Sequence, residues 1–412
     1  MMRRKGRAAG FAAAGLLLPC SASAALWTLE PSAEMAIGGN SNYSLAEHAA
    51  ATGQASASVI LGASRQTEAA TTRLDTRLTE QLLRGDLRQD EFLDQLTLSQ
   101  TLKTERDTWS GQLGSTRTDT LQGVGTSTSA NLILGHGIQQ TTNAQASWVH
   151  SLTERQSVNA SVSFTHAAYS ANLVSAQNYD EVSLGSGWQY LLDERDIVTV
   201  QASHGDDHVL DRTQRSFIDN LDVGVTRNLD ETQTLVANVG ASRSRQEVRQ
   251  GILVCPADVA LCAAGLLQPV VEQVRASTGR WGLLYDLEWS AGWTPTTRSV
   301  AHAQRSVDPS GIGLTSRSTL FSAGLDHDWS ERWHGGVNLT RSGSNLSGLT
   351  SAQQATLLTL DGHFSVALTS RWSLSSSIEL QKSDSPINGV HAHAASFLVT
   401  LHYDGQHLEA HH

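Results

Sequence analysis

The chain has no apolar run that approaches the ~20 consecutive residues a membrane-spanning helix requires. Cysteine is scarce, with three residues, and charged side chains make up only 17% of the 412 residues. Because it has no apolar run of sufficient length, the sequence excludes a helical membrane protein. With 39% hydrophobic residues and a mean hydropathy of -0.24, the composition alone also fits a soluble exported protein, so the strand pattern must decide.

The first 24 residues have the order of a secretory signal peptide. Four basic residues within positions 3–7 precede a short apolar run from Ala8 to Leu18, and small residues end at Ala22-Ser23-Ala24. We therefore predict a signal peptide over residues 1–24, with cleavage after Ala24. The alternative is a lipoprotein signal that uses Cys20, but Pro19 directly before the cysteine suits that processing poorly.

The mature chain is acidic. Removal of the signal peptide lowers Lys+Arg from 29 to 25 against 40 Asp+Glu, which gives a formal charge of -15. This balance argues against nucleic acid as a partner, and against a channel that draws polyanions through.

Two cysteines remain, Cys255 and Cys262, and in an exported chain they predict one disulfide within one loop. A metal site would need further ligands nearby, and the sequence has none there, so we expect no metal and no cofactor. Neither G-x-S-x-G nor H-E-x-x-H occurs, which favours a protein that is not an enzyme.

The most informative feature is a repeated tight turn, in which an apolar residue and a polar pair precede a new strand. From Glu105, successive turns step by 49, 40, 37, 100 and 39 residues, and they are centred on Glu105, Glu154, Glu194, Glu231, Glu331 and Ser370. The step of 100 hides one further turn near Trp293–Thr297 and the long cysteine loop. Each repeat of about 40 residues is then two strands, one short turn and one longer loop.

Between these turns apolar and polar residues alternate, as in strands with one apolar face. From Val158 to Phe164 every second residue is apolar, and the same holds from Trp281 to Trp289. About eighteen such segments occur, the first near Thr28 to Gly38 and the last near Ala394 to Tyr403. Sixteen is the alternative, because the segment from Gly125 to Leu152 is ambiguous.

Three features favour a membrane barrel over a soluble sandwich. The strands run to roughly ten to fourteen residues, as tilted membrane strands do, whereas soluble strands average about five or six. Short turns alternate with longer loops. Most tryptophans gather near the short turns, as expected of an interfacial aromatic girdle: Trp109, Trp148, Trp188, Trp289, Trp293, Trp329, Trp333 and Trp372.

We therefore predict an all-β protein, a transmembrane antiparallel up-and-down β-barrel over residues 25–403, with a periplasmic tail at 404–412. Strands in hydrocarbon must pair all their backbone groups, so the sheet has to close. An even strand number places both termini in the periplasm. The expected location is the cell outer membrane, as an integral protein.

Acidic residues on the polar face of the strands are the candidates for pore-lining charge, and they would favour cations and neutral solutes. The alternative is that they pair with inward arginines such as Arg227 or Arg243 and only stabilise the lumen. The candidate set is Asp222, Asp286, Glu288, Asp326, Asp328 and Asp361.

Several histidines are possible site residues, but each has an ordinary structural interpretation. His150-Ser151 and His204 are candidate nucleophile partners by composition only. His391 and His393 share one strand face, a spacing compatible with weak metal binding, although solvated strand-end histidines explain them as well.

The array from Trp27 to Tyr403 resembles the β-barrel porin and exosortase (PEP-CTERM)-associated outer-membrane protein families. The resemblance rests on Trp27-x-Leu29-x-Pro31, on Ser41-Asn42-x-x-Leu45, on the turns at Leu152 and Leu192, and on Arg305-Ser-Val-Asp-Pro309-Ser310-Gly311-x-Gly313. It implies a channel or accessory barrel in the export of a surface polysaccharide.

The first functional hypothesis is thus a porin-like channel for export or surface organisation of an exopolysaccharide. The second is a non-conducting structural or adhesive barrel that binds a partner through its outer loops, and the third is an outer-membrane lipid hydrolase or acyltransferase. The expected partners are outer-membrane lipid and lipopolysaccharide, the barrel assembly machinery during biogenesis, a polysaccharide, and periplasmic export components.

Overall fold

The computed structural model describes residues 25–45, 50–85, 88–120, 137–170, 177–210, 214–254, 270–309, 315–347, 352–385, 390–406 and 408–411. The predicted signal peptide and the predicted disulfide between Cys255 and Cys262 lie outside these residues. None of the described residues forms a helix long and apolar enough to cross a membrane.

The described residues form nineteen strands. The first ten are β1 (Leu26–Asn40), β2 (Thr52–Gln66), β3 (Ala70–Gly85), β4 (Gln89–Lys103), β5 (Asp107–Asp119), β6 (Ile138–Thr153), β7 (Gln156–Tyr169), β8 (Tyr179–Leu191), β9 (Asp196–Val209) and β10 (Gln214–Asn228). The others are β11 (Gln233–Val254), β12 (Val270–Thr294), β13 (Thr297–Pro309), β14 (Thr315–Ser330), β15 (Trp333–Ser347), β16 (Ala352–Ala367), β17 (Trp372–Ser385), β18 (Val390–Asp404) and β19 (Leu408–His411).

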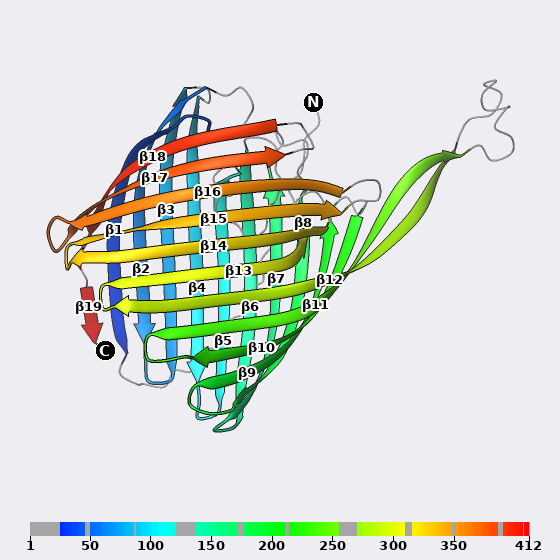
Figure 1. Ribbon diagram of the computed structural model, residues 1–412, viewed down its shortest axis with the longest axis horizontal. Coiled ribbons are helices and arrows are strands. Elements are labelled where there is room, and N and C mark those ends of the chain that lie inside the picture. Colours follow the sequence, from blue (N-terminus) through cyan, green and yellow to red (C-terminus); the bar gives the residue numbers. More distant parts are fainter. Residues whose placement is uncertain are drawn as a thin grey trace.

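Eighteen of these strands close into a barrel. Each strand pairs antiparallel with the next, and β1 pairs with β18 as well as with β2, from Ser32 opposite Asp404 to Asn40 opposite Ser396. Strands on the near and far walls cross in side view, as in a barrel with tilted strands (Figure 1). The prediction of an eighteen-stranded antiparallel barrel is confirmed, and the sixteen-stranded alternative is wrong.

The short strand β19 continues the pairing beyond β18. Leu408 to His411 lie opposite Leu29 to Leu26 at the start of β1. Part of the segment expected as a tail is therefore hydrogen-bonded to the barrel. Both ends of the described chain lie on the side of the short turns, because the start of β1 and the end of β18 are adjacent in the register.

The short turns fall where the repeated motif predicts them. Tight connections between strands occur at 104–106, 154–155, 192–195, 229–232, 295–296, 331–332 and 368–371. Two of them are closed by an aspartate. Asp193 accepts hydrogen bonds from the backbone N–H groups of Arg195 and Asp196, at 2.8 and 2.9 Å. Asp230 accepts from the backbone and the hydroxyl of Thr232, at 2.7 and 2.8 Å.

These backbone and hydroxyl hydrogen bonds stabilise the charged carboxylates of the two turns. They therefore hold the pKa values of Asp193 and Asp230 below the ordinary aspartate range. For Asp193 the two backbone N–H groups of Arg195 and Asp196 are the main cause, and for Asp230 it is Thr232.

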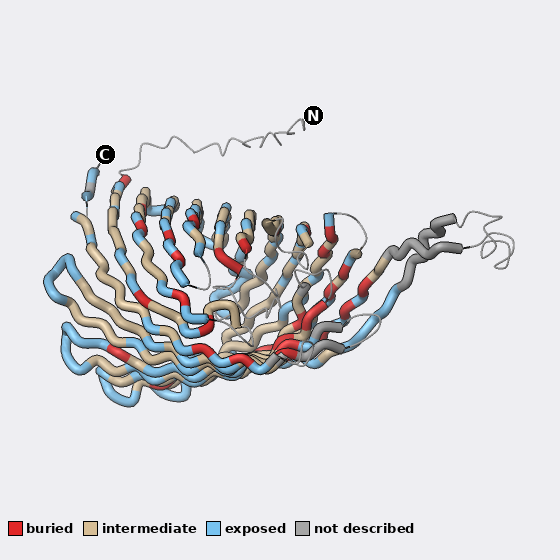
Figure 2. The backbone as a smooth tube through the Cα atoms, turned by 90° about the horizontal axis from the view of Figure 1, so that it is seen from above, coloured by how far each residue is buried: buried red, intermediate tan, exposed pale blue. Residues whose placement is uncertain are grey.

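The two faces of the sheet differ throughout the barrel. Large apolar side chains stand outward and remain widely exposed, such as Ile37, Val59 and Leu283. The opposite face carries mostly Ser, Thr, Asn, Gln and Asp. This face is the concave one, since its residues from β2 to β5 line one cavity. Few residues of the barrel are buried (Figure 2). A closed sheet with an apolar exterior satisfies the backbone and suits a lipid surrounding.

One corner of the wall departs from a regular barrel. β12 pairs with β13 only from Thr294 up to Tyr285. Beyond it the loop-side end of β13 lies against β10, and Arg317 of β14 donates a hydrogen bond to the backbone carbonyl of Trp281 on β12, beside Gly282. Val307 there joins Ile218 and Leu284 in a buried apolar cluster. The tucked ends narrow the lumen on its loop side.

The two longest strands form a hairpin that leaves the barrel at this corner. β11 and β12 pair continuously from Gln233 opposite Ala291 to Val254 opposite Val270. Above Tyr285, β12 has no partner on its other side among the described residues. On the other side, β11 stays paired with β10 up to Val248, and beyond this residue the hairpin projects away from the wall (Figure 1).

Candidate functional site

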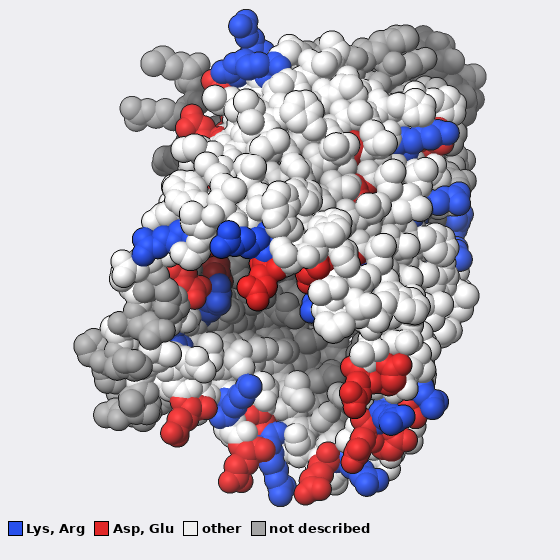
Figure 3. Space-filling view, turned by 60° about the vertical axis from the view of Figure 1, so that its left-hand side comes forward, with Lys and Arg blue, Asp and Glu red and all other residues white. Residues whose placement is uncertain are grey.

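The lumen is the candidate site, because the strand alternation concentrates polar chemistry on its wall. β5, β6 and β7 present an uncharged surface of hydroxyl and amide groups, as in Ser110, Gln145 and Asn159. The molecule is hollowed on the side where the short turns of β13 to β17 come forward, and acidic and basic side chains border the hollow (Figure 3). Such a wall favours water and polar solutes.

The structure places the six predicted acids on this inward face. The pairing register puts all of them on the opposite side from the outward Leu, Val and Trp residues of the same strands: Asp222 on β10, Asp286 and Glu288 on β12, Asp326 and Asp328 on β14, and Asp361 on β16. Their role in conduction stays a prediction.

Most of these acids contact histidines. Asp286 lies 2.7 Å from His302 Nε2, within hydrogen-bond distance, and Asp328 lies 2.7 Å from His334 Nδ1. His363 lies between two carboxylates, 3.2 Å from Asp326 and 3.6 Å from Asp361. The set continues around the β18–β1 closure, where His402 contacts Glu34 at 3.2 Å and Asp404 at 2.8 Å.

We call these residues the acid–histidine stripe: Asp286, His302, Asp326, Asp328, His334, Asp361, His363, Glu34, His402 and Asp404. It follows the turn-side half of the lumen from β12 to β1. Six carboxylates and four imidazoles therefore lie together along this wall.

The predicted arginine partners of these acids are wrong. Arg227 and Arg243 both lie on the outward face by their register, and therefore do not neutralise the lumen. Arg227 is 3.6 Å from Asp196 near a short turn. The guanidinium of Arg243 lies over the ring of Trp281, 5.7 Å from its centroid. The alternation of polar and apolar residues predicted the face on which the acids lie, but not which residues of neighbouring strands they contact.

Glycines opposite several inward polar residues let those side chains lie flat along the wall. A Cβ at Gly240 would stand 2.0 Å from Asp222 Oδ1, and one at Gly336 would stand 2.3 Å from Asp326 Oδ1. The same arrangement places Asn238 against Gly224. Because these side chains fold over glycine, they leave more of the lumen open.

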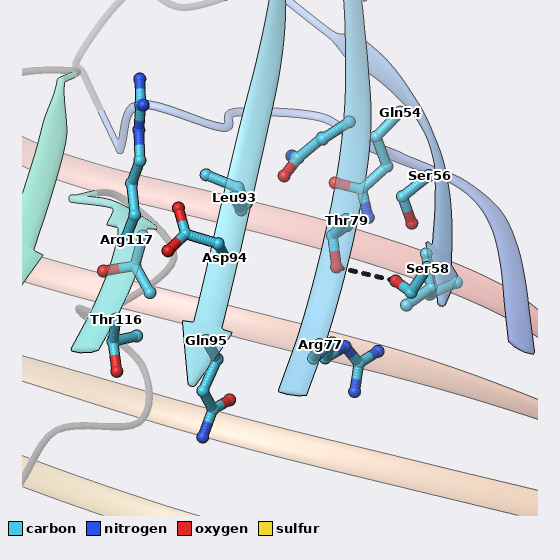
Figure 4. A pocket seen from close by; sticks show the side chains of 13 residues that line it. Gln54, Ser56, Ser58, Arg77, Thr79, Leu93, Asp94, Gln95, Thr116 and Arg117 are labelled. Atoms are coloured by element: carbon cyan, nitrogen blue, oxygen red, sulfur yellow. Dashed lines mark hydrogen bonds between the residues drawn. The ribbon is translucent and has the colours of Figure 1, made fainter. Parts of the chain in front are cut away.

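A cavity of about 280 Å³ opens in the wall of β2 to β5 on the loop side (Figure 4). Its inward lining is rich in hydroxyls and amides: Gln54, Ser56, Ser58, Thr79, Gln81 and Gln95. The hydroxyls of Ser58 and Thr79 are 2.8 Å apart and hydrogen-bonded. Tyr43, from the connection after β1, accepts a hydrogen bond from Gln81 and donates one to Asp119 at the rim. No pattern within a single strand predicts this cavity, because its lining comes from β2 to β5 and from Leu398 of β18.

The structure assembles no nucleophile pair from the predicted histidines. His150 faces outward and contacts Asp107 at 2.8 Å, whereas Ser151 has the opposite orientation on the same strand. His204 is also outward and contacts Asp219 at 2.6 Å.

The two candidate metal-binding histidines share the outward face of β18, as the spacing predicts. His391 contacts Asp384 at 2.8 Å, and His393 lies opposite Lys382. Among the described residues, no group of three or more His, Cys, Asp and Glu side chains is arranged to hold a metal ion.

The eight tryptophans predicted as a girdle lie on the outward face, within the turn-side parts of their strands. Several contact one another or nearby aromatics: the ring centroids of Trp109 and Trp148 are 5.7 Å apart, and those of Trp333 and Phe364 are 5.1 Å apart. This position matches the interface at which amphipathic rings are favoured.

These observations define a class of protein. A closed eighteen-stranded antiparallel sheet, an apolar outer wall, and a polar interior make the chain a β-barrel of the outer-membrane, porin-like type.

No family model matches the chain, and no curated protein matches its sequence. Among solved structures it is similar to the copper transporter OprC, with 9% identity over 88% of this chain and 62% of that chain, at a TM-score of 0.49. It is also similar to the outer membrane protein OpdK of Pseudomonas aeruginosa, with 10% identity over 93% and 99% of the two chains, at a TM-score of 0.47. The ferric-catecholate import receptor Fiu of E. coli K12 shares 8% identity over 91% and 81%, at a TM-score of 0.46.

Proposed function

We propose that the protein is a non-enzymatic channel of the cell outer membrane that passes polar, uncharged or cationic solutes. The observation that carries the proposal is the lumen wall, where one side is uncharged and the other holds the acid–histidine stripe. Carboxylates facing a water-filled lumen attract cations and repel anions.

Within this function, we propose a hydroxylated polymer, an exopolysaccharide, as the cargo. The cavity of β2 to β5 supports it, because serine, threonine and glutamine side chains exchange hydrogen bonds with sugar hydroxyls through both donors and acceptors. The uncharged wall of β5 to β7 extends this surface along the lumen.

Planar-bilayer recording tests both the channel and its proposed cargo. We expect the purified protein to conduct, and a salt gradient to give a reversal potential that indicates preference for cations. A neutral oligosaccharide added to one side should interrupt the current, and Gln54→Ala with Gln95→Ala should shorten the interruptions. The matched control is Gln100→Ala, because Gln100 faces outward on β4. A folded protein without conductance would refute the channel, whereas conductance indifferent to the oligosaccharide would refute only the cargo.

The projecting β11–β12 hairpin favours a second candidate function, an adhesive barrel. Beyond Val248 and Ala276 its backbone leaves the wall and is paired only within the hairpin. Cells carrying a shortened hairpin, with residues 248–276 replaced by a two-residue Asn-Gly turn that joins the paired Glu247 and Ser277, should then lose attachment to a surface polysaccharide while the barrel still folds. Unchanged attachment would exclude this role.

A further inference from the structure

The outer wall of the barrel contains an apolar groove of about 610 Å³ between β12 and β15. Alanines form its floor, at Ala301, Ala303 and Ala323, and larger side chains such as Trp289 and Phe321 stand at its sides. All five residues belong to the outward face by their register.

The register explains why the wall is hollowed here. Ala301 lies between Trp289 on β12 and Ala323 on β14, and Ala303 lies between Leu287 and Phe321. Small side chains in the middle of adjacent rows therefore leave a trough between taller neighbours. On β10, by contrast, the outward positions at mid-strand carry larger side chains, as at Leu221 and Val223.

A single cation lies at the groove. Arg341 of β15 lines it, is exposed, and stands opposite Phe321 on one side and Leu358 on the other. No carboxylate among the described residues forms an ion pair with Arg341. Glu288, His302 and Ser322 also line the groove but face the lumen by their register, so the outward lining is apolar apart from Arg341.

The height of Arg341 identifies the part of the membrane that it meets. Trp333, in the turn-side girdle, precedes it by eight residues on the same strand, which corresponds to roughly 20 Å along the barrel axis for a tilted strand. The apolar band of a membrane barrel is about 25 Å tall. Arg341 therefore lies near the loop-side boundary of the band, where headgroups begin and an arginine is tolerated.

We propose that this groove binds a phosphate-bearing lipid of the loop-side leaflet, with an acyl chain along the alanine floor and the phosphate on the guanidinium of Arg341. Charge complementarity selects this occupant, because guanidinium binds phosphate oxygens through two parallel N–H donors. The apolar groove below Arg341 gives an acyl chain a surface that a free anion would not use. The site requires insertion into a membrane, but it does not require conductance.

Native mass spectrometry of the folded protein in detergent tests the site, with phosphatidic acid as the probe and diacylglycerol of the same chains as its phosphate-free counterpart. We expect phosphatidic acid to be retained and diacylglycerol to bind at least about tenfold more weakly, as for loss of one charge-assisted contact. Arg341→Gln should weaken the retention of phosphatidic acid by the same factor. Arg245→Gln is the matched control, because Arg245 is outward on β11 over Phe217, away from the groove.

Two groove variants separate the acyl chain from the headgroup. Ala323→Phe and, as a milder change, Ala301→Leu fill the floor and leave Arg341 in place, and each should weaken retention several-fold. Slower migration after boiling confirms that each variant is folded. Three results would overturn the proposal. The filled variants could retain phosphatidic acid as well as the native protein, Arg245→Gln could lose it as strongly as Arg341→Gln, or millimolar inorganic phosphate could displace it. A dimer that disappears with Arg341→Gln would also overturn the proposal, because a second copy would then be the occupant.

Discussion

Asp326 and His363 contact each other at 3.2 Å across a strand to which neither belongs. Asp326 is on β14 and His363 on β16, and the residue between them on β15 is Gly336, which pairs with both. A Cβ on Gly336 would stand 2.3 Å from the aspartate oxygen and 2.8 Å from the imidazole Cε1. The contact between Asp326 and His363 therefore depends on the absence of a side chain at Gly336.

Gly336→Ala should separate Asp326 from His363 and push both side chains into the lumen. We expect lower single-channel conductance and a loss of about 1–3 kcal/mol in unfolding free energy, as for other overpacked sites. The matched control is Gly362→Ala on the outward face of β16, where a Cβ meets nothing closer than 4.0 Å. Equal effects of the two substitutions in bilayer recording and urea unfolding would contradict this account.

The acid–histidine stripe predicts that its carboxylates determine ion selectivity. Asp326→Asn with Asp361→Asn removes two negative charges beside His363 at nearly unchanged side-chain size, so the preference for cations should decrease. Reversal potentials in a salt gradient measure this directly. The outward Asp219→Asn is the control and should keep the native selectivity. Equal reversal potentials in the native protein and in the double variant would count against the stripe.

The sequence predicted the strands and the short turns because both are local properties. Alternation and the repeated turn motif lie within single strands or at their junctions, as at Glu154 and Glu194. The partners of the acids were not predictable in this way, since Asp326 meets His363 only through the register of three strands.

The tucked ends of β13 and β14 and the long β11–β12 hairpin were also missed. Both arise where β12 leaves β13 at Tyr285, and no residue pattern marks the end of a strand pair. The groove at Arg341 was missed for the same reason, because alanines from two strands have to become neighbours before a hollow exists.

The depressed pKa of Asp230 predicts a pH-dependent contribution to stability. The unfolded chain binds a proton at the ordinary value of 3.8, and the folded turn does so only at lower pH. The contribution is therefore fully present above the ordinary value and is lost as pH falls through the lowered one.

Asp230→Ala should consequently lower the urea midpoint at pH 7, and the difference from the native protein should shrink progressively below about pH 4. Asp230→Asn keeps an acceptor for Thr232, so its urea midpoint should lie between those of the native protein and Asp230→Ala. Glu231→Ala, in the same exposed turn, is the control that should have little effect. A deficit in Asp230→Ala that is the same at pH 7 and in acid would contradict the linkage.

Closure through β1 and β18 predicts a sharp difference between two truncations. A chain that stops after Gly405 loses β19 but keeps the whole pairing of Ser32–Asn40 with Ser396–Asp404, so it should still fold. A chain that stops after Ser385 loses β18, which leaves β1 and β17 as open edges that a membrane does not tolerate. Only the first should migrate faster unheated than boiled and resist protease in lipid vesicles. Folding of the shorter chain would show that the barrel does not need the β1–β18 closure.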